Sequence, residues 1–127
     1  MAVPPDLATE RLLLRPPRAD DAAAVLVFRG DPVVQRFDDP PIQTLDESRA
    51  FLEELWRDME AERLDAWVAV PVGTAEAIGL VTLQYRPGDR HHRRAEIGYG
   101  FARAWWGKGY GSEAACAVVR HAFDTLD

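Results

Sequence analysis

The feature that most constrains this chain is a run of alternating glycines between a predicted strand and a predicted helix. Gly-Lys-Gly-Tyr-Gly occupies positions 107–111, and Ser112 follows directly. Glycine permits positive φ and lets a bulky group approach the backbone. The first turn of a helix presents unpaired N–H groups and a partial positive charge. The turn therefore predicts a site for a diphosphate, with Lys108 and Ser112 as further donors; a tight turn capped by Ser112 is the alternative.

Two other glycine-rich phosphate loops do not fit these residues. A Walker loop needs glycine where Ala102 stands and serine or threonine where Gly109 stands. The dinucleotide-binding fingerprint Gly-x-Gly-x-x-Gly could begin at Gly98 or at Gly107. Its third glycine is missing in both cases, because Arg103 or Ser112 occupies that position. Neither a P-loop nucleotide hydrolase nor a Rossmann dehydrogenase is supported.

Hydrophobic spacing predicts an α+β fold in one domain over residues 1–127, with helices packed on a largely antiparallel sheet. Thr44 and Glu47 have the spacing of a capping box, which marks the start of the second helix. The predicted elements are a strand over 10–16, helices over 22–29 and 45–63, strands over 67–70, 77–85 and 95–102, and a helix over 112–126. The last helix is expected to bury Ala115, Val118, Val119, Ala122 and Phe123.

The charge distribution favours an anion site in the second half of the chain. The formal net charge is −6; residues 1–64 contain 14 acidic and 8 basic side chains, and residues 65–127 contain 7 of each. This balance argues against nucleic-acid binding, which usually requires a basic surface. The acidic half, including Asp38 and Asp39, fits either a cationic acceptor or a solvated surface.

The cysteine count and the hydropathy pattern predict a cytoplasmic protein. Cys116 is the single cysteine, so no internal disulfide is expected. We find no signal peptide and no apolar run near the ~18 residues of a membrane span.

Four ordered segments resemble the GNAT superfamily of N-acyltransferases, in the branch that contains the ribosomal-protein-alanine acetyltransferases. They are Thr-Glu-Arg-Leu-Leu-Leu-Arg (9–15), Ala-Ile-Gly-Leu-Val-Thr-Leu (77–83), Ala-Glu-Ile-Gly-Tyr (95–99) and Trp-Gly-Lys-Gly-Tyr-Gly-Ser-Glu-Ala (106–114). The resemblance covers nearly the whole chain. One departure is Trp106, which stands at the first, polar position of the superfamily signature.

The resemblance implies an acetyl-CoA site and its residues. The backbone at Phe101 and Ala102 would pair with the pantetheine arm, and an amide there would stabilise the oxyanion. Arg103 and Lys108 would be phosphate partners, or simply solvated cations. The backbone amides expected to hold the pyrophosphate belong to Gly107, Lys108, Gly109, Tyr110, Gly111 and Ser112.

The implied reaction is direct attack by a primary amine on acetyl-CoA, in a ternary complex and without a metal. The amine would be a small molecule or a protein N-terminus. Glu96 is the candidate general base, and an interstrand hydrogen bond or ion pair is its alternative role. His91 and His92 are expected in a solvated turn, and His121 and Cys116 on the last helix, none with a role in the chemistry.

The family pattern also implies a further strand, helix and hairpin after residue 127, about 30–45 residues by ordinary element lengths. The tyrosine that usually acts as the acid belongs to that part. We therefore expect a C-terminally incomplete fold and a homodimer formed at the open sheet edge. A CoA-binding or interaction module without turnover, and a structural half-domain without a ligand, remain as alternatives.

Overall fold

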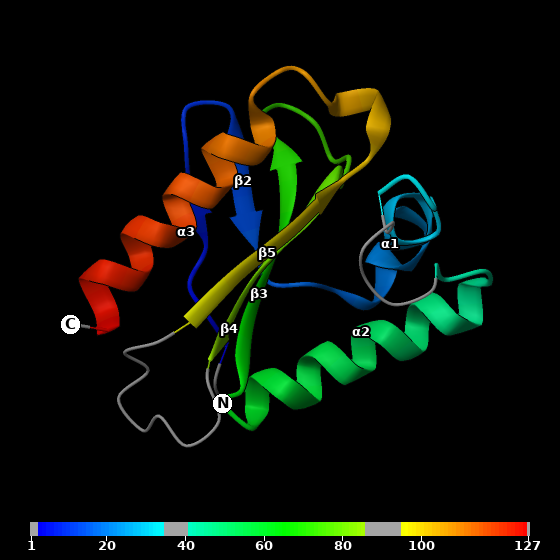
Figure 1. The fold of residues 1–127 in the computed structure, drawn as a ribbon, viewed down its shortest axis with the longest axis horizontal. Coiled ribbons are helices and arrows are strands. Elements are labelled where there is room, and N and C mark those ends of the chain that lie inside the picture. Colours follow the sequence, from blue (N-terminus) through cyan, green and yellow to red (C-terminus); the bar gives the residue numbers. More distant parts are fainter. Residues whose placement is uncertain (1–2, 35–40, 86–94, 127) are drawn as a thin grey trace.

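The computed structural model describes residues 3–34, 41–85 and 95–126 (Figure 1). A five-stranded antiparallel sheet in the order β1-β2-β3-β4-β5 forms the centre, flanked by three α-helices in this part of the chain. The predicted α+β class is confirmed. The elements are β1 (Leu7–Ala8), β2 (Leu12–Arg15), η1 (Ala19–Asp21), α1 (Ala22–Arg29), α2 (Leu45–Glu60), β3 (Leu64–Pro71), β4 (Gly79–Tyr85), β5 (Ala95–Phe101), η2 (Arg103–Trp105) and α3 (Tyr110–Leu126).

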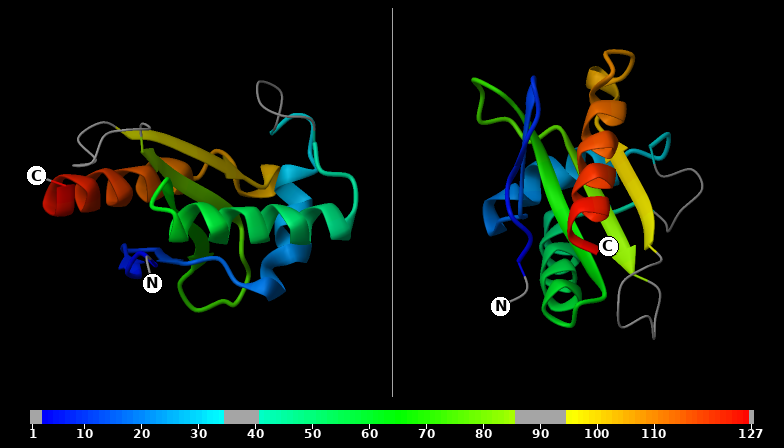
Figure 2. Two further views of the ribbon diagram at one scale, coloured as in Figure 1. Left: turned by 90° about the horizontal axis from the view of Figure 1, so that it is seen from below. Right: turned by 90° about the vertical axis from the view of Figure 1, so that its left-hand side faces the viewer.

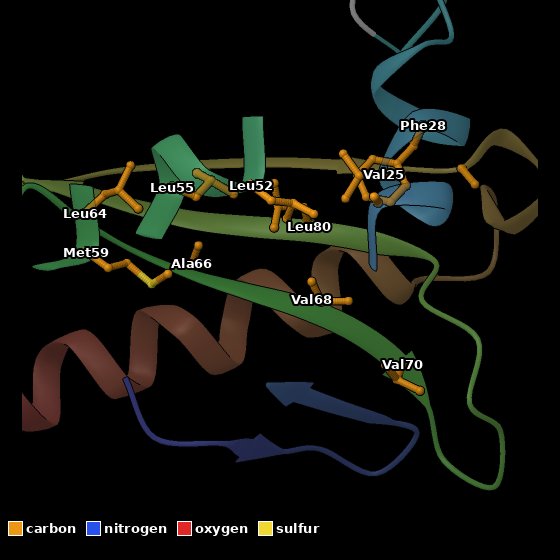
Figure 3. Close-up of a cluster of buried hydrophobic side chains, with 12 residues drawn as sticks. Val25, Phe28, Leu52, Leu55, Met59, Leu64, Ala66, Val68, Val70 and Leu80 are labelled. Carbon is orange, nitrogen blue, oxygen red and sulfur yellow. The ribbon is translucent and has the colours of Figure 1, made fainter. Parts of the chain in front are cut away.

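Side chains that alternate along β3 divide between two hydrophobic cores, because successive residues of a strand point to opposite faces. Ala66 and Val68 pack with α1 and α2 on one face (Figure 3). Trp67 and Ala69 pack with α3 on the other. Figure 2 shows the resulting arrangement, with α3 on one side of the sheet and α1 and α2 on the opposite side. The sheet thus separates α3 from α1 and from the acidic helix α2.

The predicted start of α2 is confirmed, and its end differs. The Thr44 hydroxyl accepts a hydrogen bond from the Glu47 amide at 3.1 Å, and the Glu47 carboxylate accepts one from the Gln43 amide at 3.1 Å. The helix ends at Glu60 instead of residue 63. Glu62 has a φ of 59°, which turns the chain into β3.

The buried face of α3 matches the predicted one at Val118 and Ala122 and differs from it at Val119 and Phe123. Ala114 and Val118 are fully buried, whereas Phe123 is 75% and Val119 37% exposed. The carboxylate of Glu113, in the first turn of the helix, binds the N-terminal segment and holds this rotation of the helix. None of the helices in the described ranges combines the length and hydropathy needed to cross a bilayer.

Candidate functional site

The glycine-rich turn lies between η2 and α3, where its backbone takes conformations that favour glycine. Gly107 has a φ of 79° and Gly109 a φ of 83°. A Cβ added at Gly107 would meet nothing within 4 Å, whereas one at Gly109 would lie 3.3 Å from the Arg11 Nη2. The third glycine, Gly111, lies in the first turn of α3, and its Cβ would be 3.1 Å from the Tyr99 ring. Gly107 and Gly109 therefore share a positive φ, whereas Gly111 is restricted by its close approach to the Tyr99 ring.

Arg11, in the turn between β1 and β2, braces this loop. Its Nη1 donates to the Lys108 carbonyl at 2.9 Å, and its Nε donates to the Glu113 carboxylate at 2.6 Å. The guanidinium carbon lies 4.3 Å from the centre of the Tyr110 ring. The Glu113 carboxylate also accepts hydrogen bonds from the Arg11 amide and the Thr9 hydroxyl. The N-terminal segment thus holds both the loop and the start of α3.

These contacts keep Glu113 ionised to lower pH than a free glutamate. Burial alone would raise the pKa of Glu113, but hydrogen bonds from Thr9 and Arg11 and the charge of Arg11 outweigh it, so the pKa is lowered. The pKa of Arg11 is raised, mainly by the hydrogen bond to Glu113. The pair is therefore charged throughout the neutral range.

A cavity of about 300 Å³ opens beside the loop, where β5 ends. Val34, from the segment after α1, contributes to its wall. Its other lining residues come from the end of β5, the two tryptophans and the loop: Tyr99, Gly100, Phe101, Trp105, Trp106, Gly107, Gly109, Tyr110, Gly111 and Ser112. Six of the ten predicted site residues, Phe101, Gly107, Gly109, Tyr110, Gly111 and Ser112, therefore share one cavity.

A larger cavity, of about 620 Å³, lies between Pro16, Pro17 and the last turns of α2. Trp56 and Met59 contribute apolar walls, and Glu53 is one of three charged residues in its lining. This lining contains neither a glycine-rich turn nor a helix N-terminus. The smaller cavity is therefore the better candidate for anion chemistry.

The free edge of β5 also opens beside the loop. The Ala102 amide donates to the Ile78 carbonyl at 2.9 Å, continuing the β4–β5 pairing. Because hydrogen-bonded pairs alternate along an antiparallel ladder, the Phe101 amide faces away from β4, toward an edge that pairs with no strand in the described chain. The Trp106 indole donates to the Phe101 carbonyl at 2.7 Å. Trp106, which stands at the first position of the superfamily signature, thus holds the end of β5 in place.

The two basic residues expected near phosphate differ in their surroundings. The Arg103 Nε donates to Asp31 Oδ2, which forms an ion pair between η2 and the segment after α1. The Lys108 ammonium is exposed, 5.2 Å from the centre of the Trp105 ring. Lys108 is therefore the more available of the two to an incoming anion.

Glu96 lies in β5 opposite Gln84 and is exposed. It is not among the residues that line the cavity. Five residues of extended strand, about 17 Å, separate it from Phe101. Asp38, Asp39, His91 and His92 lie outside the described residues.

The remaining candidates are located on α3. The Cys116 side chain is exposed, and the His121 ring packs edge-on against Trp67 at 5.5 Å between ring centres. Within 3–34, 41–85 and 95–126, no three His, Cys, Asp or Glu side chains are grouped to hold a metal ion.

Two residues that sequence reasoning did not assign to the site, Arg11 and Asp31, contact predicted site residues. Arg11 lies in the Thr-Glu-Arg segment, whose match to the family was the available signal. Asp31 follows α1 with no comparable motif. Both contacts join segments about 70 to 100 positions apart in the chain. Local sequence patterns do not predict contacts at that separation.

Comparisons with known proteins match nearly the whole chain. The family described as acetyltransferase (GNAT) domain matches residues 11–127. The uncharacterized N-acetyltransferase p20 of Bacillus licheniformis is 31% identical over 123 residues, which cover 95% of this chain and 67% of that protein.

Solved structures agree in fold. An acetyltransferase of the GNAT family from Bacillus anthracis superposes with a TM-score of 0.79 at 27% identity, covering 94% of this chain and 67% of that one. RimL, a ribosomal L7/L12 α-N-protein acetyltransferase solved in complex with coenzyme A, superposes with a TM-score of 0.78 at 18% identity, covering 93% of this chain and 67% of RimL.

Proposed function

Because the chain belongs to the GNAT acetyltransferase family, we propose that it transfers the acetyl group of acetyl-CoA to a primary amine by direct attack in a ternary complex. The observation that carries this proposal is that the glycine-rich loop and the unpaired edge of β5 meet at one cavity. Gly107 and Gly109, whose φ angles are positive, precede α3 and line this cavity together with Phe101 at the end of β5.

The loop residues fit the pyrophosphate of CoA. A helix N-terminus carries a partial positive charge and free N–H groups, and α3 is 17 residues long. The backbone amides of 107–112 are the proposed ligands, with Lys108 as a mobile cation. Arg11 holds the loop through the Lys108 carbonyl and does not line the cavity.

The edge of β5 fits the rest of the cosubstrate. Acetyl-CoA, when bound, supplies an acyl group activated as a thioester. We assign the Phe101 amide to the pantetheine arm or to the developing oxyanion, since an N–H in this position stabilises negative charge as the amine attacks. The Ala102 amide already donates to Ile78, so its contribution is to hold the end of the strand.

Proton removal from the amine does not need a strong base. A protein N-terminal α-amine has a pKa of about 8 and is partly neutral at physiological pH. Glu96 is the proposed base. Because about 17 Å of strand separates it from Phe101, more than one bridging water can span, it would have to act through a chain of several waters. The acceptor is a protein N-terminus or a small amine, and RimL, named as an α-N-protein acetyltransferase, is an example of the first.

The proposed setting is a cytoplasmic homodimer of a domain that includes residues 1–127. The part of the unpaired β5 edge that begins at Ala95, away from the Phe101 end assigned to CoA, is the proposed contact between copies. Sedimentation of the chain as a monomer at high concentration would contradict this assembly.

Two measurements on the 127-residue chain test the function. Titration calorimetry with CoA is expected to show saturable binding, and a thiol-release assay with acetyl-CoA and a panel of amines is expected to show amine-dependent release of CoA. Binding without release for every amine would overturn the transferase and favour a CoA-binding module. No binding at all would overturn the placement of CoA as well.

A further inference from the structure

The cavity of about 620 Å³ at the end of α2 has the size and the lining of a small-molecule site. Its apolar surface comes from Val3, Pro16, Pro17, Trp56 and Met59. Sites for small ligands commonly have volumes of about 300–1,000 Å³ and a mostly apolar lining with a few polar groups. This cavity shares no lining residue with the one assigned to CoA. The end of α2 and the glycine-rich loop lie at opposite ends of the sheet (Figure 1), so the two cavities are separate sites.

Hydrogen bonds to backbone carbonyls hold the walls of this cavity in place. Three side chains donate to proline carbonyls: Trp56 Nε1 to Pro17 at 3.0 Å, Arg15 Nη1 to Pro16 at 3.3 Å, and Trp67 Nε1 to Pro5 at 2.9 Å. Arg15 is itself fixed by two hydrogen bonds of 2.9 Å to the Asp21 carboxylate, and both side chains are buried. The walls are therefore formed before any ligand binds, which lowers the entropic cost of binding.

Two carboxylates of the lining have no partner within the described residues. Glu53 and Glu60 are exposed, and neither carboxylate forms a hydrogen bond or an ion pair with another residue in 3–34, 41–85 or 95–126. With Arg57 as the third charged residue, two acids and one base give the lining a net charge of −1. Glu60 is also the last residue of α2, where the helix dipole favours positive charge. The cavity therefore favours a cation over an anion.

The remaining lining residues favour an organic cation over an inorganic one. Tryptophan attracts cations more strongly than the other aromatic side chains, and Trp56 is part of the wall. Met59 and the two prolines offer apolar surface, whose burial against an apolar group is favourable. A small inorganic cation would gain nothing from these walls. A ligand that uses both the charge and the apolar surface is an ammonium ion attached to an apolar body.

We propose that this cavity binds an ammonium ion that carries an aromatic or branched aliphatic body. The body packs against Trp56 and Met59, and the positive charge lies near Glu53 and Glu60. This binding site goes beyond the proposed acetyl transfer and does not depend on it, because the cavity assigned to CoA is elsewhere. For a ligand of about ten non-hydrogen atoms we expect a Kd of about 0.1–5 mM.

Benzyltrimethylammonium is the probe, because a quaternary amine cannot accept an acetyl group. Four tryptophans give four indole signals in a nitrogen–proton correlation spectrum. Trp56 reports on this cavity, and Trp105 and Trp106 report on the cavity assigned to CoA. The probe should shift the Trp56 signal, which is identified by its loss in Trp56→Phe, and leave the other two unchanged with or without CoA. A shift confined to Trp105 and Trp106, or no shift of Trp56 well above the expected Kd, would overturn the proposal.

Charge variants test the cationic class of the ligand. Glu53→Gln and Glu60→Gln should each weaken the probe about two- to fivefold, since exposed charges interact weakly, and Arg57→Gln should strengthen it by a similar factor. Glu54→Gln is the matched control, because Glu54 is exposed on the same helix and does not line the cavity. The neutral benzyl alcohol and the anion phenylacetate should bind more weakly than the probe.

Three results would contradict this assignment. Equal affinity for benzyl alcohol and the probe would show that the cavity does not select a cation. The same Kd in Glu53→Gln, Glu60→Gln and Glu54→Gln would exclude the two carboxylates as the source of selectivity. A Trp56 signal that shifts with protein concentration alone would show that a second copy of the chain occupies the cavity.

Discussion

Replacing Gly109 by alanine tests how the loop geometry produces CoA binding. At a φ of 83° an alanine is strained by about 1–2 kcal/mol. Its Cβ would also lie 3.3 Å from the Arg11 Nη2, so the guanidinium must move and weaken its bond to the Lys108 carbonyl. Because the Arg11 side chain is 41% exposed, water replaces part of that bond, so its loss adds little to the strain.

This backbone strain, about 1–2 kcal/mol, is what CoA must supply to restore the loop conformation. At 1.4 kcal/mol per factor of ten, it corresponds to a Kd for CoA raised about 5- to 30-fold. Titration calorimetry measures the Kd for CoA directly, and melting followed by circular dichroism shows whether the variant is still folded.

Two other glycines serve as matched controls for this substitution. Gly107→Ala has the same strain, with a φ of 79° and nothing within 4 Å of its Cβ, so it should weaken CoA by less than Gly109→Ala. Gly73→Ala, with a φ of 85° in the β3–β4 turn, should lower stability and leave CoA affinity unchanged. Wild-type affinity in Gly109→Ala, or an equal loss in Gly73→Ala, would refute the reasoning.

Three further substitutions test the contacts of Glu113, the buried Trp67 ring and the exposed face of α3. Glu113→Gln should lower stability at pH 7 by roughly 1 kcal/mol. Since the folded pKa of Glu113 is lowered, its contribution is present above the ordinary glutamate pKa and is lost as the pH falls through the folded value. The melting temperatures of the variant and the wild type should thus converge as the pH falls below the ordinary glutamate range, and a constant difference would argue against ionisation as the cause. Trp67→Ala removes a fully buried ring and its hydrogen bond to the Pro5 carbonyl, and should cost about 3–5 kcal/mol in urea unfolding. Phe123→Ala, at a side chain 75% exposed, should change stability by less than about 0.5 kcal/mol. A large loss of stability would show that Phe123 is buried, as the hydrophobic spacing of the helix predicts.

Some elements could be predicted because their signals are local. The helix over 22–29 is observed with those bounds, since its apolar run ends at Gly30. The cap at Thr44 is a contact between residues three apart. In the loop, glycine at 107 and 109 reflects a backbone conformation, which is also a local property. The resemblance placed Phe101 and most of the loop residues together, and they share one cavity.

Other features depended on contacts that no local pattern contains. The two-residue strand β1 exists through its pairing with β2 and was not predicted. Periodicity alone permitted more than one buried face on α3, and the hydrogen bond that the Arg11 amide donates to the Glu113 carboxylate accompanies the observed one. Arg103, which the resemblance implied as a phosphate partner or a solvated cation, is paired with Asp31, 72 positions away.

The fold class and the position of the glycine-rich loop could be predicted because hydrophobic period, capping and glycine φ are properties of neighbouring residues, and the family could be recognised from four matching segments. What holds that loop and which charges lie beside it follows from the tertiary structure. Arg11 and Asp31 reach the site through chain folding, and the partner of a charged side chain is set by which segments the core brings together.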